Sequence, residues 1–175
     1  MNLKKRLKFT ESNSIINIFN PVKIKLIIMK KLIILLFLGI YSLAGIAQEA
    51  DKIVGIWWND EKTTKIKVEK VNGKYIGTIV YMIPEKYVNG KPPVDDKNPD
   101  AKLQTRSLIG LQILSGFVHN AGDKEWENGT IYDPKSGKTN DCYAWLESND
   151  LLKLKGFVMG MRWLGKSSEW YRTTL

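Results

Sequence analysis

The sequence has few of the residues on which metal centres, disulfides and nucleophilic catalysis depend. Cys142 is the only cysteine and His119 the only histidine among 175 residues. One cysteine excludes an intrachain disulfide, and one cysteine with one histidine cannot supply the usual ligands of zinc. Neither residue lies in a recognisable nucleophile motif. We therefore interpret Cys142 as a small buried apolar residue and His119 as a solvated turn residue, and predict no metal and no cofactor.

An excess of positive charge is also lacking once the N-terminal segment is set apart. Residues 1–47 hold eight of the 27 Lys and Arg residues and one of the 18 acidic residues. Residues 48–175 thus carry 19 basic and 17 acidic residues, a net charge of +2 rather than the +9 of the whole chain. This near balance gives no support for nucleic-acid binding.

No apolar run reaches the about 20 residues that a membrane-spanning helix needs. Met29-Lys30-Lys31 is followed by an apolar run at 32–40 and by the small residues of Gly45-Ile46-Ala47. This order is typical of a secretory signal peptide at 29–47, with cleavage before Gln48. Residues 1–28 precede a natural start and are interpreted as a spurious or unstructured extension. We expect a protein secreted across the inner membrane, periplasmic or extracellular, without a membrane span after cleavage.

Residues 48–175 contain short extended segments between turns. Residues 65–69 alternate strictly between apolar and charged side chains, which is the period of a half-buried strand, and Asn72-Gly73 follows as a hairpin turn. A second hairpin joins strand residues 130–132 to an extended run through 133–137, where proline and glycine favour a turn. About eight such strands, without a long helical pattern, predict a single all-β domain, a barrel or sandwich.

Two further segments carry specific predictions. Residues 103–117 hold a short apolar run that fits a buried strand or one short helix, and we interpret it as a strand bent at Gly110. Residues 84–102 form a long polar loop in which Asp96, Asn98 and Asp100 have the spacing that opens a calcium loop. Ala101 and Ser107 stand where that loop requires Gly and Glu, so we interpret the three polar residues as Asx-turn residues that order the loop.

Several motifs of this chain resemble a family of secreted bacterial proteins of uncharacterised activity, domain of unknown function family 2147. The resemblance covers nearly all of residues 48–175 and implies a compact, up-and-down, lipocalin-like β-barrel of about eight antiparallel strands. It implies no activity. The chain departs from the family pattern at residues 140–141 and 167–169. The motifs are Gly55-x-Trp57, Asp96-x-Asn98-Pro99, Arg106-x-Leu108-x-Gly110, Trp126-x-x-Gly129-x-Ile131-Tyr132-Asp133-Pro134-x-x-Gly137-Lys138, Leu154-x-Gly156 and Trp170-x-Arg172.

A second similarity is to lipocalins, which carry Gly-x-Trp on the first strand and an arginine near the last strand. Trp57 and Arg172 occupy the corresponding places here. We expect the guanidinium of Arg172 to pack over the Trp57 indole, a contact worth about 1 kcal/mol where partly exposed. Since the first and last strands of a closed barrel must pair, this contact would help to close it.

A barrel of about eight strands has room for packed side chains or for one small ligand. We predict that Arg106 holds an anionic group at the barrel mouth and that Asp133 belongs to the same site. Four aromatic residues would complete the lining: Trp126, Tyr132, Trp145 and Trp163. The alternative is that the tryptophans fill the core and Arg106 pairs with Asp96 or Asp133.

We therefore expect a monomeric binding module for an unknown small molecule or envelope component, without catalysis. An envelope hydrolase using Asp96 and Asp133 with Arg106 is the alternative from another class, because paired carboxylates can perform glycoside hydrolysis. A structural or interaction module with a solid core is a third possibility.

Overall fold

The computed structural model describes residues 21–175, without the side chains of residues 23 and 37–47. The chain divides into two compact units at the boundary between residues 47 and 48. One helix, α2 (Pro21–Ala50), occupies the start of the described chain. No helix among the described residues is long and apolar enough to cross a membrane. The N-terminal extension predicted at residues 1–28 falls largely outside the described residues.

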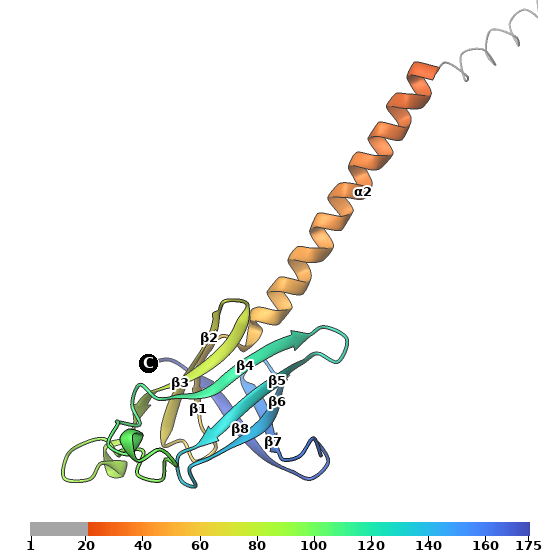
Figure 1. Ribbon diagram of the computed structural model, residues 1–175. Coiled ribbons are helices and arrows are strands. Elements are labelled where there is room, and N and C mark those ends of the chain that lie inside the picture. Colours follow the sequence, from red (N-terminus) through yellow and green to blue (C-terminus); the bar gives the residue numbers. More distant parts are fainter. Residues whose placement is uncertain (1–20) are drawn as a thin grey trace, which may run out of the picture. The chain divides into compact units, whose positions relative to one another are not determined.

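The second unit is a closed antiparallel barrel in which each strand pairs with its neighbours in the sequence and β1 pairs with β8 (Figure 1). This arrangement confirms the predicted all-β, lipocalin-like fold class. Short 3₁₀ turns precede or interrupt the strands at η1 (Asp51–Ile53), η2 (Pro84–Lys86) and η3 (Ala101–Leu103). The strands are β1 (Gly55–Trp58), β2 (Thr64–Val71), β3 (Lys74–Met82), β4 (Gln112–Asn120), β5 (Glu125–Asp133), β6 (Lys138–Ser148), β7 (Leu151–Phe157) and β8 (Gly165–Thr173).

The predicted hairpins form because their turn residues accept positive φ. Asn72 and Gly73 have φ values of 51° and 78° between β2 and β3, as a tight two-residue hairpin turn requires. Gly137 has φ 71° between β5 and β6. Each hairpin fixes the register of its strands, so the side chains that face the interior are set from the turn outward.

Barrel closure uses the contact expected from the sequence. Trp57 and Arg172 are paired residues of β1 and β8, and the guanidinium carbon lies 4.0 Å from the centroid of the Trp57 ring. Arg172 also donates hydrogen bonds to the backbone carbonyls of Lys52, Val54 and Asn149 at 2.6–3.0 Å. One side chain thus joins the first strand, the last strand and the segment that precedes the barrel.

One end of the barrel is filled by that preceding segment. Ile53 is buried, and its carbonyl oxygen accepts a hydrogen bond from Trp57 Nε1 at 2.9 Å. Trp126 Nε1 donates to the carbonyl of Ala50 at 3.0 Å, and the Trp126 ring makes an edge contact with Tyr75. All buried apolar residues of the described chain lie between Ala50 and Trp170. The unit from residue 48 to 175 therefore contains the whole closed sheet and its core, as an independently folding domain requires.

The predicted strand at residues 103–117 is wrong in its first half. β4 begins only at Gln112, and Gly110 has φ 92°, which an extended strand does not allow. The segment turns there because Leu111 N–H bonds to the carbonyl of Leu108, while Gly110 N–H and the Leu111 carbonyl both bond to Ile79 on β3. The apolar residues are buried by a turn that packs on the sheet rather than by a strand.

The interpretation of His119 as a solvated turn residue is also wrong. His119 lies in β4, opposite Trp126 of β5, with ring centroids 4.9 Å apart. Its Nε2 atom is buried without a hydrogen-bond partner among the described residues. Burial lowers the pKa of His119 below its ordinary value of 6.5, and nearby Glu49 only partly offsets this effect.

Candidate functional site

The end of the barrel opposite η1 is open. In an up-and-down barrel alternate connections lie at the same end, and the β1–β2, β3–β4 and β5–β6 connections gather there (Figure 1). The β7–β8 loop projects to the other side, and only the adjoining ends of β7 and β8 reach the opening. A cavity of about 380 Å³ enters the barrel at this opening. The open half of the interior is thus hollow, whereas the half near η1 is packed with side chains.

The floor of the cavity is apolar because β2, β3, β4, β5, β7 and β8 each turn an apolar residue inward at this depth. Ile66 of β2 and Leu154 of β7 are buried, and the Trp170 indole of β8 lies beside them. Strand alternation explains the pattern, since residues of one face recur at every second position. The remaining apolar lining residues are Ile79, Met82, Leu108, Ile113 and Ile131.

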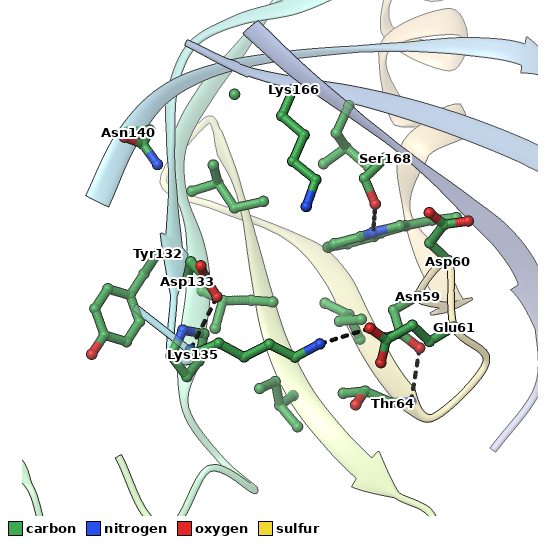
Figure 2. Close-up of a pocket in the computed structure, with 18 of the residues that line it drawn as sticks. Asn59, Asp60, Glu61, Thr64, Tyr132, Asp133, Lys135, Asn140, Lys166 and Ser168 are labelled. Carbon is green, nitrogen blue, oxygen red and sulfur yellow. Dashed lines mark hydrogen bonds and ion pairs between the residues drawn. The ribbon is translucent and has the colours of Figure 1, made fainter. Parts of the chain in front are cut away.

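The rim of the cavity is polar and charged. Lys135 in the β5–β6 turn reaches across the mouth to Glu61 in the β1–β2 loop, with Nζ and Oε1 2.7 Å apart (Figure 2). Both side chains are about half or more exposed, so this ion pair is weak and can open. The other polar residues of the rim are Asn59, Asp60, Thr64, Asp133, Asn140, Lys166, Ser167 and Ser168.

Two polar side chains extend the rim into the interior. Lys166 and Ser168 share the inner face of β8 with Trp170, whose Nε1 donates to Ser168 Oγ at 3.2 Å. Figure 2 shows the Lys166 ammonium group pointing into the cavity, and Asn140 of β6 also lines the cavity. Lys166 makes no ion pair with any described residue, so its charge is available to an incoming group. Sequence reasoning missed Lys166 and Ser168, although their two-residue spacing from Trp170 indicated this face.

Outside the wall, the long β3–β4 loop is held by a buried carboxylate, Asp95, which is fully inaccessible to solvent. Arg106 donates to its Oδ2 atom through Nε at 3.0 Å and Nη2 at 2.8 Å, and Asn98 Nδ2 donates to the same atom at 2.8 Å. The Tyr132 hydroxyl donates to Oδ1 at 2.6 Å. Burial would raise the pKa of Asp95, but these hydrogen bonds outweigh it and hold the pKa below its ordinary value.

The loop also fits closely against the β5–β6 hairpin. A side chain at Gly137 would place its Cβ only 1.9 Å from the carbonyl oxygen of Lys97. Within the loop, Asn98 Oδ1 accepts from the Asp100 N–H at 2.9 Å, and Asp100 Oδ1 accepts from the Lys102 N–H at 3.0 Å. Asp96 is instead exposed and pairs with neighbouring Lys97 at 3.2 Å. The loop thus depends on Asp95, which sequence reasoning did not select, beside Asn98 and Asp100.

The structure separates the six residues predicted to bind a ligand. Tyr132 and Asp133 line the cavity, but the Tyr132 ring turns outward (Figure 2), and Asp133 accepts hydrogen bonds from Lys135 N and Ser136 Oγ within its own turn. The other four do not line it. Arg106 binds Asp95 and Trp126 fills the closed end, whereas Trp145 stacks on Tyr143 and Trp163 is 77 % exposed in the β7–β8 loop.

Cys142 faces the barrel interior and is buried. Burial raises its pKa to about 12, so the thiol stays protonated at physiological pH. No group of three or more His, Cys, Asp or Glu side chains suited to hold a metal ion occurs among the residues that the structure describes.

Comparison with known proteins places this geometry in a wider group. The family described as "Uncharacterized protein conserved in bacteria (DUF2147)" matches residues 55–172. No curated protein sequence matches the chain. A solved structure that it resembles is protein HP1028 from the human pathogen Helicobacter pylori, described as belonging to the lipocalin family. The two are 25% identical with a TM-score of 0.60, and the match covers 69% of this chain and 82% of that one.

Proposed function

The chain belongs to the DUF2147 family of uncharacterised proteins conserved in bacteria, and from this premise we propose that it is an envelope protein that binds a small amphipathic molecule in its open barrel, without chemistry. The observation that carries the proposal is the hollow half of the barrel. A cavity of about 380 Å³ lies within the range of about 300–1,000 Å³ that is usual for ligand pockets. In a barrel that acts only as a solid structural module, side chains would be expected to fill this volume.

The lining indicates the class of ligand. The buried floor around Ile66, Leu154 and Trp170 offers only apolar contacts, which suit a hydrocarbon chain or a ring. Above the floor, Lys166 and Asn140 face the cavity with polar atoms free to bind. A ligand with an apolar body and one anionic group, such as a carboxylate, would satisfy both levels at once.

The residues considered for hydrolysis are engaged elsewhere. Asp133 caps its own turn, Asp96 is exposed beside Lys97, and Arg106 is bound to Asp95. A pair of carboxylates acting on a glycosidic bond must face each other across the substrate. Asp133 lines the cavity but Asp96 does not, so the geometry favours binding over this chemistry.

Titration with anilinonaphthalenesulfonate, an apolar anion whose fluorescence rises in apolar surroundings, tests the proposal. Ile131→Trp adds bulk inside the cavity and is expected to abolish binding. Thr130→Trp adds the same bulk at the adjacent position, which does not line the cavity, and is expected to leave binding unchanged. Lys166→Gln is expected to weaken binding by about threefold to tenfold through loss of a partly exposed charge.

Equal binding by the Ile131→Trp and Thr130→Trp variants would refute the cavity as the site. Melting curves of both variants show whether the barrel remains folded. The envelope location has its own test: the N-terminal sequence of protein recovered from the envelope fraction is expected to begin at Gln48. Protein that retains residues 29–47 and stays in the cytoplasmic fraction would refute it.

A further inference from the structure

The β7–β8 connection exposes an unusual amount of apolar surface. Residues 158–164 form this loop, and four of its seven residues are large exposed hydrophobic side chains. Met159 is 87 % exposed and Trp163 77 %, with Leu164 and Val158 near one half. Contiguous exposed apolar side chains of this kind mark interaction sites on soluble domains.

Contacts with β5 and β6 hold the loop in a fixed conformation. Arg162 lies over the Tyr143 ring, 3.7 Å from its centroid, and forms ion pairs with Glu125 and Glu127 of β5. Backbone hydrogen bonds within the loop join residues 158 and 161 and residues 161 and 164. The apolar side chains therefore project from a base that the barrel wall positions, and exposing them costs no further rearrangement.

The sequence segment that carries the loop is basic. Residues 151–166 contain three lysines and one arginine but no acidic residue. Arg162 pairs with Glu125 and Glu127, and Lys153 lies between Glu147 and Glu169 at 3.5–3.6 Å, so these two cations are already paired. Lys155 and Lys166 form no ion pair within the described residues. Two free cations thus flank the apolar loop.

We propose that this loop docks the barrel onto an anionic phospholipid surface. Met159, Trp163 and Leu164 would enter the boundary between headgroups and acyl chains, where tryptophan is enriched, while Lys155 and Lys166 meet the lipid phosphates. The loop is a projecting tip beyond β7 and β8 (Figure 1), which suits insertion into a yielding surface.

Docking by this loop would also position the cavity. The loop joins the ends of β7 and β8, where Gly156 and Lys166 line the cavity. Docking would thus hold the cavity near the lipid surface, so that an amphipathic molecule could pass between bilayer and barrel. The docking itself does not depend on ligand binding and is tested separately.

Co-sedimentation of the barrel unit, residues 48–175, with vesicles tests the docking. Vesicles of phosphatidylglycerol mixed with phosphatidylcholine are compared with vesicles of phosphatidylcholine alone. The wild-type barrel is expected to bind the anionic vesicles, and Met159→Asp with Trp163→Asp to lower the partition coefficient by about tenfold or more. Lys155→Gln or Lys166→Gln is expected to lower it by about fivefold each, an effect that high salt removes.

The matched control adds the same two charges elsewhere on the barrel. Val71 and Val118 are exposed apolar residues of β2 and β4, near the closed end. The Val71→Asp, Val118→Asp variant has the same net charge as the loop variant and is expected to retain most of the binding. Equal loss in both double variants, equal binding to both kinds of vesicle, or no binding by the wild type would overturn the proposal.

Discussion

The hydroxyl of Tyr132 offers a direct measure of what holds the long loop to the barrel. It donates a 2.6 Å hydrogen bond to Asp95 Oδ1, while the hydrogen bonds from Arg106 and Asn98 to Asp95 go to Oδ2. The hydroxyl also accepts a longer hydrogen bond from Asn98 Nδ2, at 3.2 Å. Tyr132→Phe would leave Oδ1 of a fully buried carboxylate without its donor. Hydrogen bonds to charged groups contribute about 1.5–3 kcal/mol, so we expect the free energy of unfolding to fall by about 2 kcal/mol.

Urea unfolding at pH 7 measures this loss, and its pH dependence identifies the cause. Because the pKa of Asp95 in the folded protein lies below its ordinary value of 3.8, its contribution is present above that value and is lost as the pH falls through the folded pKa. Tyr132→Phe removes one of the hydrogen bonds that lower the pKa. The difference between the two proteins should therefore be largest at neutral pH and shrink as the pH falls below 3.8.

The matched control is Tyr87→Phe. Tyr87 is half-buried against the core, and its hydroxyl makes no hydrogen bond to any described residue. This variant is expected to stay within about 0.5 kcal/mol of the wild type. A Tyr132→Phe loss no larger than that of the control, or a loss that does not change with pH, would refute the assigned role of Asp95.

Three further predictions concern stability. Gly137→Ala should lower the free energy of unfolding by more than about 2 kcal/mol, whereas Gly73→Ala, at a similar φ in open space, should lower it by about 1 kcal/mol. Equal decreases in the two variants, measured by urea unfolding, would contradict the close contact between Gly137 and the loop. Arg172→Met should cost about 2–3 kcal/mol by urea unfolding, since it removes the cation over Trp57 and three backbone hydrogen bonds; a loss below 1 kcal/mol would exclude that role. The pKa of His119 is lowered in the folded state, so the unfolded state binds more protons and the free energy of unfolding should fall as the pH drops below 6.5. His119→Phe should remove this pH dependence between pH 7.5 and 5.5. An unchanged pH dependence in the variant would assign the effect to another group.

Local sequence signals were sufficient for both predicted hairpins and for most of the strands. The alternation at residues 65–69 and the turn residues at Asn72-Gly73 depend only on a few neighbouring positions, so they can be recognised from the sequence alone. The family motifs then supplied the closed, lipocalin-like barrel that the structure confirms. Arg172 over Trp57 could be expected because closure must bring the first and last strands together.

The side of the barrel wall on which each tryptophan lies could not be predicted from local sequence patterns. β5 carries an irregularity between Trp126 and Gly129, where Asn128 has φ 57°, and this shifts the residues that face inward. Trp126 faces inward as a result, but it is near the start of β5 and so fills the closed end rather than the mouth. Trp163 lies in a connection, where no periodicity applies.

The contacts of the long loop depend on tertiary packing. Asp95 and Asp96 are adjacent and chemically identical, yet one is fully buried and the other exposed. Only the position of Arg106 and Tyr132 relative to the loop distinguishes them. The motif residues around positions 96–99, 106 and 132–137 therefore report how the loop attaches to the barrel. Other motif residues, among them Ile131, Leu154 and Trp170, line the cavity, whereas its cation Lys166 lies outside the recognised motifs.

Native mass spectrometry of protein purified from its own cells tests the central claim most directly. The account predicts that the wild-type barrel carries a small amphipathic molecule, that Thr130→Trp retains it, and that Ile131→Trp, whose new side chain occupies the cavity, does not. A wild-type barrel that is empty, or the same bound mass in both tryptophan variants, would contradict a binding site in the open half of the barrel.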